Sequence, residues 1–308
     1  MSVIGIDTSN YTTSVAYFDG VSGVNCSRLL PVKPGELGLR QSDAVFAHTK
    51  SLPDLSGRLF SNAEVGKITA VGVSTRPRAV EGSYMPCFMV GYSHAKLLSD
   101  ALGVPLVEVS HQQGHVAASL WSAGHLELMD EPHLAWHLSG GTTELLLVEP
   151  EGKNVKCTKI GGTTDISAGQ LIDRTGVMLD LPFPAGKHVD ALSKEAFLKE
   201  TFKVKCPGME FSLSGVQNKV QQFHQKNGVP AETAAFALRC VASAVYQATQ
   251  NALKAYSGLK VVFSGGVASN SMLREVIAPL NPIFCEPQYS TDNAMGVAVL
   301  THRYTQEG

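Results

Sequence analysis

The sequence predicts an α/β protein made of two lobes, each built on a mixed β-sheet, and three observations support this prediction. The chain has 308 residues, more than one small core requires. Short β-rich runs alternate with helical stretches, the order expected of α/β lobes. A strand–turn–strand unit occurs twice, at residues 3–18 and 134–148, and its threonine pairs fall in register at an offset of 130. We therefore expect a first lobe over residues 1–130 and a second over 131–308.

The individual elements follow from local patterns. In the first half, β-rich runs at 3–7 and 12–18 predict a hairpin, and further strands are expected at 71–74 and 106–109. Helices are expected over 40–60 and 89–102, and a third begins after Ser110, whose hydroxyl suits an N-cap. In the second half, runs at 134–138 and 142–148 predict the second hairpin. A strand at 260–263 and helices over 231–256, 270–278 and 293–304 complete it.

Composition narrows the class of protein. Charged residues make up 17% of the chain and apolar residues 44%, as in soluble globular proteins. The net charge of −2 gives no global basic field for nucleic acid, and the local basic cluster visible in the first half is Arg76, Arg78 and Lys96. The six cysteines show no C-x-x-C pair, which indicates scattered reduced thiols. The chain opens as a strand, and no apolar run reaches membrane-spanning length. We expect a cytoplasmic protein without a membrane contact.

A pair of histidines is the first candidate site. His111 and His115 are four residues apart, so on a helix both imidazoles lie on one face and can bind one metal ion. A zinc peptidase would need a glutamate base in H-E-x-x-H, but the intervening residues here are Gln112, Gln113 and Gly114, which speaks against that class. Asp292 either caps the last helix or supplies a third ligand of the oxygen type that iron and manganese accept. His137 is either a strand histidine satisfied inside the sheet or a further polar site residue.

Glycine-paired turns are the second candidate site. Three such pairs lie at 140–141, 161–162 and 265–266, and the first and third follow an apolar strand and a serine. Such turns let backbone N–H groups approach a phosphate. Asn270 could bond a ribose or a base edge, and the carboxylates of Asp173 and Asp190 could gather with Gly186 around paired hydroxyls. The alternative is a set of tight turns, a capped helix and a proline-rich loop without a ligand.

These motifs, in this order, resemble the TsaD family of tRNA threonylcarbamoyltransferases. The family's H-x-E-G-H is represented by residues 111–115, V-S-G-G-x-T by 138–143, D-R-x-G by 173–176, P-x-G-x-x-x-D by 184–190, F-S-x-S-G by 211–215, G-G-V-A-x-N by 265–270 and T-D-N-A by 291–294. The resemblance covers nearly the whole chain. The chain departs from the pattern at Gln113, which replaces the family glutamate, over residues 74–91, and after the first turn, where the family's acidic pair is missing.

The resemblance implies an actin/hexokinase-like fold, with two ribonuclease-H-like lobes around a nucleotide cleft. It implies one divalent metal ion on His111, His115 and Asp292, with iron first and zinc second. His137 stands where some family members have a metal-ligating tyrosine, and could be a fourth ligand. An adenine nucleotide is implied as substrate or ligand. The residues expected to bind substrate are His137, Leu138, Ser139, Gly140, Gly141, Asp173, Gly186, Asp190 and Asn270.

The activity that the resemblance implies is transfer of a threonylcarbamoyl group from threonylcarbamoyl-AMP to the tRNA adenosine next to the anticodon. Two alternatives stay open: a carbamoyl-type transferase with another acceptor, and a non-catalytic nucleotide-binding scaffold. Because the chain is acidic, we expect it to act on tRNA through a complex. The polar helical region 40–59 resembles the part where family members dock a homologous partner, so a partner or second copy is expected on the first lobe.

Overall fold

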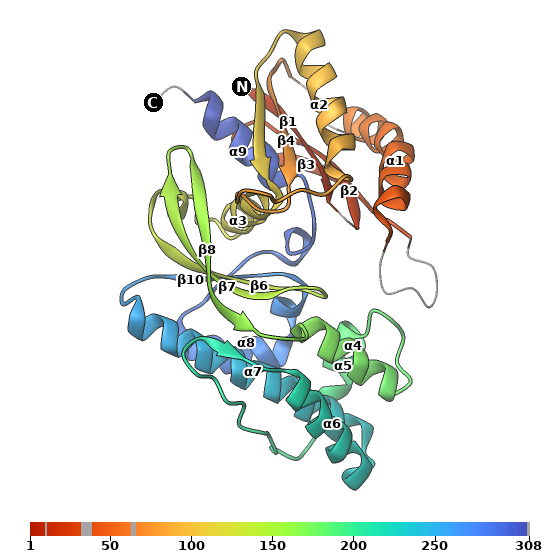
Figure 1. The fold of residues 1–308 in the computed structure, drawn as a ribbon, viewed down its shortest axis with the longest axis vertical. Coiled ribbons are helices and arrows are strands. Elements are labelled where there is room, and N and C mark those ends of the chain that lie inside the picture. The colour runs from red at the N-terminus through yellow and green to blue at the C-terminus, as the bar shows by residue number, and fades with distance from the viewer. Residues whose placement is uncertain (10, 32–38, 63–65, 307–308) are drawn as a thin grey trace. The chain divides into compact units, whose positions relative to one another are not determined.

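A computed structural model describes residues 1–9, 11–31, 39–62 and 66–306. The chain forms two compact units (Figure 1). Unit 1 contains Met1–Glu131, Glu149–Cys157 and Asp292–Gly308, and unit 2 contains Pro132–Val148 and Thr158–Thr291. The first passage between them follows Glu131, next to the boundary expected at residue 130. The C-terminal segment returns to unit 1 at Asp292, a return that a single division of the chain does not describe.

Unit 1 is built on a five-stranded mixed sheet in the order β3-β2-β1-β4-β5. The strands are β1 (Ser2–Ser9), β2 (Thr12–Phe18), β3 (Gly23–Leu29), β4 (Ile68–Arg76) and β5 (Leu106–Ser110). The expected first hairpin is confirmed, since β1 and β2 pair antiparallel from Val3 opposite Phe18 to Ser9 opposite Thr12. β4 lies parallel to both β1 and β5. Sequence patterns did not predict β3, whose exposed half has no apolar alternation.

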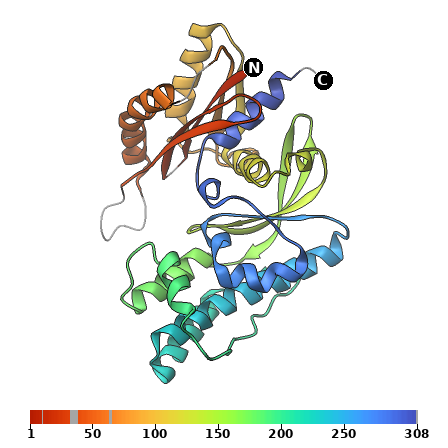
Figure 2. The same ribbon diagram turned by 180° about the vertical axis from the view of Figure 1, so that it is seen from behind.

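Helices cover both faces of this sheet (Figures 1 and 2). The helices are α1 (Gln41–Asn62), α2 (Phe88–Leu102), α3 (His111–Ser122) and α9 (Met295–Thr305), with a 3₁₀ turn at Leu126–Asp130. Because strand residues alternate between faces, Ile4 and Ile6 join the apolar core shared with α1 and α2. Gly5 faces the other way, and a Cβ there would lie 2.6 Å from the backbone nitrogen of Ala298 in α9.

The helices α3 and α9 cross in direct backbone contact. A Cβ on Gly296 would lie 1.8 Å from the carbonyl oxygen of Gly114 and 2.8 Å from the nitrogen of Ala118. Only glycine allows two helix backbones to approach this closely. Gly114 lies between His111 and His115, and Gly296 follows Asp292 by four residues. The crossing therefore fixes the distance between the histidine pair and the start of α9.

Unit 2 is built on a six-stranded sheet in the order β11-β10-β6-β7-β8-β9. The strands are β6 (His133–Leu138), β7 (Thr143–Glu151), β8 (Asn154–Thr163), β9 (Glu210–Phe211), β10 (Val261–Ser264) and β11 (Ile283–Phe284). The second hairpin is confirmed as β6 antiparallel to β7. The sequence predicted a turn at Gly161–Gly162, but in the structure this pair is part of β8. A Cβ on Gly162 would lie 2.3 Å from the carbonyl oxygen of Thr143, so this pair serves close strand packing.

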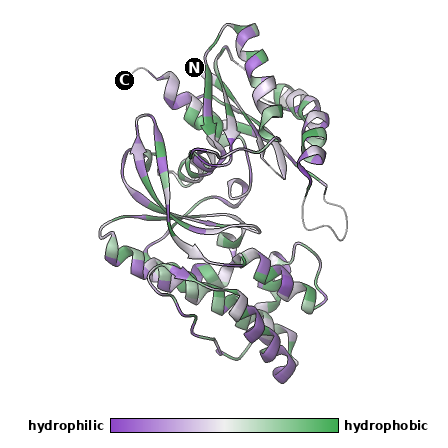
Figure 3. Ribbon diagram, viewed as in Figure 1, coloured by the Kyte–Doolittle hydropathy of each residue, from purple (hydrophilic) through white to green (hydrophobic). Residues whose placement is uncertain are grey.

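Long helices complete unit 2, with α7 (Pro230–Ala255) packed against the sheet through the core that contains Trp136 and Phe263. The indole N–H of Trp136 donates to the hydroxyl of Thr249 at 2.9 Å. The other elements are α4 (Ala168–Met178), α5 (Gly186–Ser193), α6 (Ser214–Asn227), α8 (Ser271–Ile277) and the 3₁₀ turns at Gly266–Ser269, Ala278–Leu280 and Pro287–Tyr289. Figure 3 shows α6 as mostly hydrophilic, which explains why apolar periodicity did not predict it.

Asp165, just after the end of β8, holds the F-S-x-S-G motif within unit 2. Its carboxylate accepts hydrogen bonds from the hydroxyls of Ser212 and Ser214 and from the backbone nitrogen of Leu213, at 2.5, 2.6 and 2.8 Å. Burial works against the charge, but these donors hold the pKa of Asp165 below its usual value. The F-S-x-S-G segment is thus tied to the end of β8 by one carboxylate. Among the described residues, no helix combines the length and apolarity needed to cross a membrane.

We expect Gly296→Ala to lower the free energy of unfolding by at least ~2 kcal/mol, because the added methyl must push α9 off the α3 backbone. Gly57→Ala is the matched control, since it lies inside α1 with no atom within 4 Å of the position that its methyl would take. That control should be stabilised by roughly 0.5–1 kcal/mol, because alanine loses less backbone entropy in a helix. Urea unfolding of both variants measures the difference, and equal effects would contradict a close crossing.

Candidate metal centre and glycine-lined group

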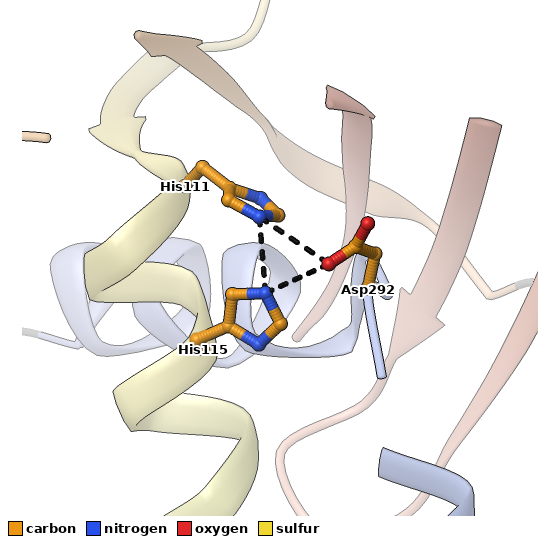
Figure 4. Close-up of side chains that lie close together, drawn as sticks. All are labelled: His111, His115 and Asp292. Atoms are coloured by element: carbon orange, nitrogen blue, oxygen red, sulfur yellow. Dashed lines mark hydrogen bonds and ion pairs between the residues drawn. The ribbon is translucent and has the colours of Figure 1, made fainter. Parts of the chain in front are cut away.

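The candidate metal centre is a group of three side chains in unit 1 (Figure 4). His111 and His115 project from adjacent turns of α3, and Asp292 stands on the segment that leads into α9. The two Nε2 atoms are 3.0 Å apart. Oδ1 of Asp292 lies 3.1 Å from Nε2 of His115 and 3.5 Å from Nε2 of His111. The structure therefore brings together the three residues that the sequence singled out.

The three distances fit one metal ion. Ligands about 2.1 Å from a metal ion lie roughly 3.0 Å apart at an angle of 90° and roughly 3.4 Å apart at a tetrahedral angle. The observed spread of 3.0–3.5 Å spans these two cases. Two imidazoles and one carboxylate on one side of an ion form the donor set typical of non-haem iron, and zinc also accepts it. Such a set leaves positions open for a substrate oxygen.

Asp7 lies directly behind His111, at the carboxyl end of β1. Its Oδ1 lies 3.0 Å from Nδ1 of His111 and also accepts a hydrogen bond from the Ser74 hydroxyl on β4. A proton on Nδ1 directed at this carboxylate leaves Nε2 as the ligand atom, the arrangement by which a second carboxylate orients a metal-binding histidine. The Asp7 side chain is fully buried, and its Oδ2 has no hydrogen-bond partner among the described residues.

The electrostatics of this group favour a positive charge. Burial would lower the pKa of His111, but Asp7 and Asp292 outweigh it and raise the pKa to about 10. Burial would raise the pKa of Asp292, yet hydrogen bonds from His111 and His115 hold it well below its usual value. The pKa of Asp7 is lowered in the same way by His111 and Ser74, against the effect of burial. Two ionised carboxylates thus face the imidazoles, and a divalent cation can take the place of the proton on Nε2 of His111.

Gln113, the departure from the family pattern, does not belong to this group. Its Oε1 accepts hydrogen bonds from the backbone nitrogen and the hydroxyl of Ser110, which closes a capping box at the start of α3. Its Nε2 donates to the carbonyl oxygen of Val155 at 2.8 Å. Ser110 is the N-cap that the sequence predicted. Gln113 therefore orients the helix that carries the histidines, and its amide is committed to structural contacts.

The second group of predicted residues lies in unit 2, around the turn between β6 and β7. The turn is closed by hydrogen bonds between Ser139 and Thr142, and the carbonyl of Gly140 accepts from the hydroxyl of Ser167 at the start of α4. A Cβ on Gly140 or Gly141 would meet no atom within 4 Å. The space where a side chain would stand is therefore open at both glycines, while the backbone of Gly140 packs closely against Gly169 of α4. The side chain of Leu138, also predicted to bind substrate, is buried in the core, so only its backbone can face a ligand.

The predicted carboxylates tie neighbouring helices of unit 2 together. Oδ1 of Asp190 on α5 accepts from Nδ2 of Asn270 at 2.8 Å and from the nitrogen and hydroxyl of Ser271, at the start of α8. Asp173 on α4 accepts from the nitrogen of Ala185, next to Gly186, and burial raises its pKa. These hydrogen bonds bring α4, α5 and the start of α8 together. Both carboxylates also have structural partners, a role that the sequence did not indicate.

The remaining glycines and His137 divide into different roles. Gly266 has open space where a Cβ would stand, whereas Gly265 has a φ of +90° and lies against the carbonyl of Leu138, so it is needed for close packing. His137 lies on β6, opposite Glu144 of β7 and Ser264 of β10. It belongs to unit 2 and is not one of the three clustered residues. Its part as a metal ligand or substrate contact stays a prediction.

Sequence reasoning missed Asp7 and Ser74. The first strand ends in an acid, which was visible in the run V-I-G-I-D. Its partner His111 lies 104 residues away, and nothing in local periodicity pairs the two. A search for buried acids at the carboxyl ends of strands would have found Asp7, because such ends of parallel strands meet at the site edge of α/β sheets.

Comparison with solved structures supports the fold. The HypF structure from T. kodakarensis shares 12% identity and a TM-score of 0.63, covering 98% of this chain and 47% of that one. A ROK hexokinase from Thermus thermophilus shares 15% identity and a TM-score of 0.54, with complete coverage of both chains. At these identities the likeness concerns the fold alone. The expected actin/hexokinase-like fold with two α/β lobes and mixed sheets is confirmed.

Comparison at the sequence level identifies the family. The family model described as tRNA N6-adenosine threonylcarbamoyltransferase, TsaD, matches residues 37–299. A protein of that name from Carboxydothermus hydrogenoformans is 32% identical, over 98% of this chain and 92% of its own length. Another from Thermosipho africanus is 31% identical, over 100% and 96%. With its motifs in order on this fold, the chain belongs to the TsaD family of transferases.

Proposed function

We propose that this chain transfers a threonylcarbamoyl group from threonylcarbamoyl-AMP to the tRNA adenosine next to the anticodon, and that it needs one metal ion to do so. The observation that carries the proposal is the convergence of His111, His115 and Asp292 in a TsaD-family chain. A non-catalytic scaffold would not need to keep three ligand atoms within 3.5 Å of one another. An intact donor set therefore favours the enzyme over the scaffold.

The metal ion would be held by those three residues, with iron as the first choice from the donor set and zinc as the second. A bound ion supplies Lewis-acid polarisation of the acyl oxygen. The chain's own contribution is to orient the ligands. Asp7 and Ser74 direct His111, while Gln113 anchors the start of α3.

The adenylate would bind on unit 2. Gly140, Gly141 and Gly266 leave backbone N–H groups open to phosphate oxygens, and Asp173, Asp190 and Asn270 offer groups that recognise ribose hydroxyls. In the reaction, the exocyclic amine of the adenosine attacks the carbamoyl carbon. The bond from that carbon to the phosphate oxygen breaks, AMP leaves and the amine gives up one proton. The residues lower the barrier chiefly by positioning the reactants.

We further propose that the chain acts on tRNA within a complex, and that a homologous partner or a second copy docks on unit 1. The helices α1 and α2 support this. Phe46 on α1 is 65% exposed and Leu97 on α2 is 72% exposed. A partner that covered these side chains would remove their apolar surface from water. Light scattering of the chain alone and with candidate partners tests this assembly.

We expect about one equivalent of a transition metal per chain when the protein is prepared without chelators. His111→Ala/His115→Ala should abolish binding, and Asp7→Asn should weaken affinity by ~10-fold or more, because His111 loses the charge that orients it. His125→Ala is the matched control, since it removes a half-exposed histidine that pairs with Glu127, outside the group of three. Elemental analysis and chelator competition give the readout. Full occupancy in the double variant would remove the proposed centre.

We expect Gly186→Ala to weaken adenine-nucleotide binding while leaving the fold intact. No atom lies within 4 Å of the position that its methyl would take, so only a ligand would meet it. Asp190→Ala is less informative, since it also breaks the contacts with Asn270 and Ser271. Nucleotide at a hundredfold excess over its dissociation constant stabilises a fold by about 3 kcal/mol, so the thermal midpoint should rise in the parent and less in Gly186→Ala.

Gly57→Ala is the control for that measurement, because its added methyl also meets no atom within 4 Å and it lies in α1 of unit 1, whereas Gly186 lies in unit 2. A nucleotide shift that is the same in all three proteins would argue against a ligand at Gly186. No shift at millimolar nucleotide in the parent would argue against nucleotide binding altogether.

The transfer activity itself is tested in a deletion strain. Mass spectrometry of tRNA nucleosides should show loss of threonylcarbamoyladenosine, restored by the parent chain but not by His111→Ala/His115→Ala. An unchanged nucleoside profile on deletion would contradict the proposed acceptor and leave the alternatives of another acceptor or a scaffold.

A further inference from the structure

An extended segment crosses the surface of unit 2 without helix or strand of its own. Residues 197–208, which we call the strap, connect the region after α5 to β9. Backbone nitrogens of Phe197 and Leu198 donate to the carboxylate of Glu232, at 2.8 and 3.1 Å. At the other end, the amide of Asn251 donates to the carbonyl of Gly208. The strap is therefore held at both ends by side chains of α7.

The distance between these anchors shows that the strap is nearly straight. Glu232 and Asn251 are about 28 Å apart along α7, at 1.5 Å per residue. The ten Cα–Cα steps from Leu198 to Gly208 can reach at most about 35 Å. A third contact holds the middle, where the backbone nitrogen of Phe202 donates to Sγ of Cys240 at 3.3 Å. A chain this extended places successive side chains on opposite sides.

The outward side of the strap is basic. Val204 is buried, so its neighbours Lys203 and Lys205 are directed outward, about 7 Å apart. Lys199 is also exposed, and none of these three lysines forms an ion pair with a residue that the structure describes. Arg239 joins them, since its guanidinium donates to the carbonyl of Glu200. Glu200 is the single acid within the strap.

Charge is distributed unevenly between the two units. Unit 2 contains 13 Lys and Arg against 11 Asp and Glu, while unit 1 contains 12 against 16. The cluster expected to be basic from the sequence is partly neutralised, because Lys96 pairs with Asp100 at 2.6 Å. The overall charge of −2 therefore conceals a basic surface on unit 2.

Aromatic side chains accompany these lysines. Phe197 is 91% exposed, which is unusual for a phenyl group. Helix α6 is mostly hydrophilic (Figure 3). The ammonium group of its Lys219 lies 5.8 Å from the centre of the partly exposed Phe202 ring. Surfaces that combine free cations with exposed rings are typical of proteins that bind single-stranded RNA, because phosphates meet the cations and bases stack on the rings.

We propose that the strap and Lys219 form a binding surface for an RNA strand, with Lys199, Lys203 and Lys205 contacting phosphates and Phe197 offering a stacking face for an unpaired base. The inference rests on the proposed function, in which the RNA is the acceptor tRNA. Because the strap is already held straight by α7, little backbone entropy is lost on binding.

The test compares two triple variants of the full chain. Lys199→Gln/Lys203→Gln/Lys205→Gln removes the strap charges, and Lys67→Gln/Lys156→Gln/Lys254→Gln removes the same charge from exposed positions outside the strap and outside α1. Affinity for a labelled tRNA transcript is measured from low to moderate salt. The strap variant should bind roughly 10- to 100-fold more weakly, and the slope of log affinity against log salt should fall by about two to three. The control should stay within about twofold of the parent.

Phe197→Ala tests the stacking contact and should weaken binding to a single-stranded RNA oligonucleotide by ~5-fold or more without changing the salt slope. Equal losses of tRNA affinity in both triple variants would show that the effect comes from net charge alone, and would overturn the proposal. No RNA binding by the parent at low salt would also overturn it. So would a strap variant with unchanged RNA affinity but altered oligomeric state by light scattering, since the strap would then be a protein contact.

The same variants separate this inference from the proposed function. Nucleoside analysis that shows threonylcarbamoyl transfer by the parent, together with unchanged tRNA affinity in the strap variant, would leave the function standing and remove the strap as an RNA surface. Loss of tRNA affinity in the strap variant, together with unchanged tRNA nucleosides in the deletion strain, would keep the strap as an RNA surface and remove the proposed function.

Discussion

The crossing of α3 and α9 at Gly114 and Gly296 is the constraint on which the candidate centre depends. Since neither residue has a side chain, the two backbones meet directly, and a Cβ on Gly296 would overlap the carbonyl of Gly114 at 1.8 Å. The histidine pair lies on α3, and Asp292 lies on the segment that leads into α9, so the contact joins the two parts of the candidate centre. A longer separation of the helices would draw the carboxylate away from both imidazoles. Backbone packing thus helps to set the distance between the carboxylate and the two imidazoles.

Behind this packing, the charges of unit 1 are arranged to suit a cation. The pKa values of the buried Asp7 and the half-buried Asp292 are both lowered, and the cost of desolvating these carboxylates is offset by His111, whose pKa rises to about 10. A proton balances the carboxylate charges poorly, because it is bonded to one imidazole nitrogen and can be shared with only one further ligand atom. A divalent ion satisfies all three ligand atoms at once. The polar contacts of unit 1 therefore favour a divalent ion over a proton at this group.

Local sequence patterns predicted much of the fold, because a hairpin, a helix cap or an amphipathic helix depends on residues that are close together in the chain. The hairpins at 3–18 and 134–148, the capped start of α3 at Ser110, and the long helix α7 all follow from alternation, caps or apolar periodicity. The histidine pair and Asp292 were found by spacing and family motif. Asp7 was not, because its contact with His111 exists only after β1 and α3 have packed. For the same reason the sequence misplaced Gly161–Gly162 in a turn and gave no sign of the strap.

The amide of Gln113 limits how freely sequence can be exchanged within the family. Its Nε2 donates to the carbonyl of Val155, an oxygen contributed by a distant hairpin. A glutamate there would keep the capping contact with Ser110 but set a carboxylate oxygen against that carbonyl, at a cost of about 1–3 kcal/mol for the lost donor. Introducing the family-type residue should therefore be unfavourable in this background. Because the acceptor is a main-chain carbonyl, substitutions at 154–157 would relieve the conflict only by moving that oxygen, so chimaeras or reconstructed ancestors of this chain should exchange both segments together.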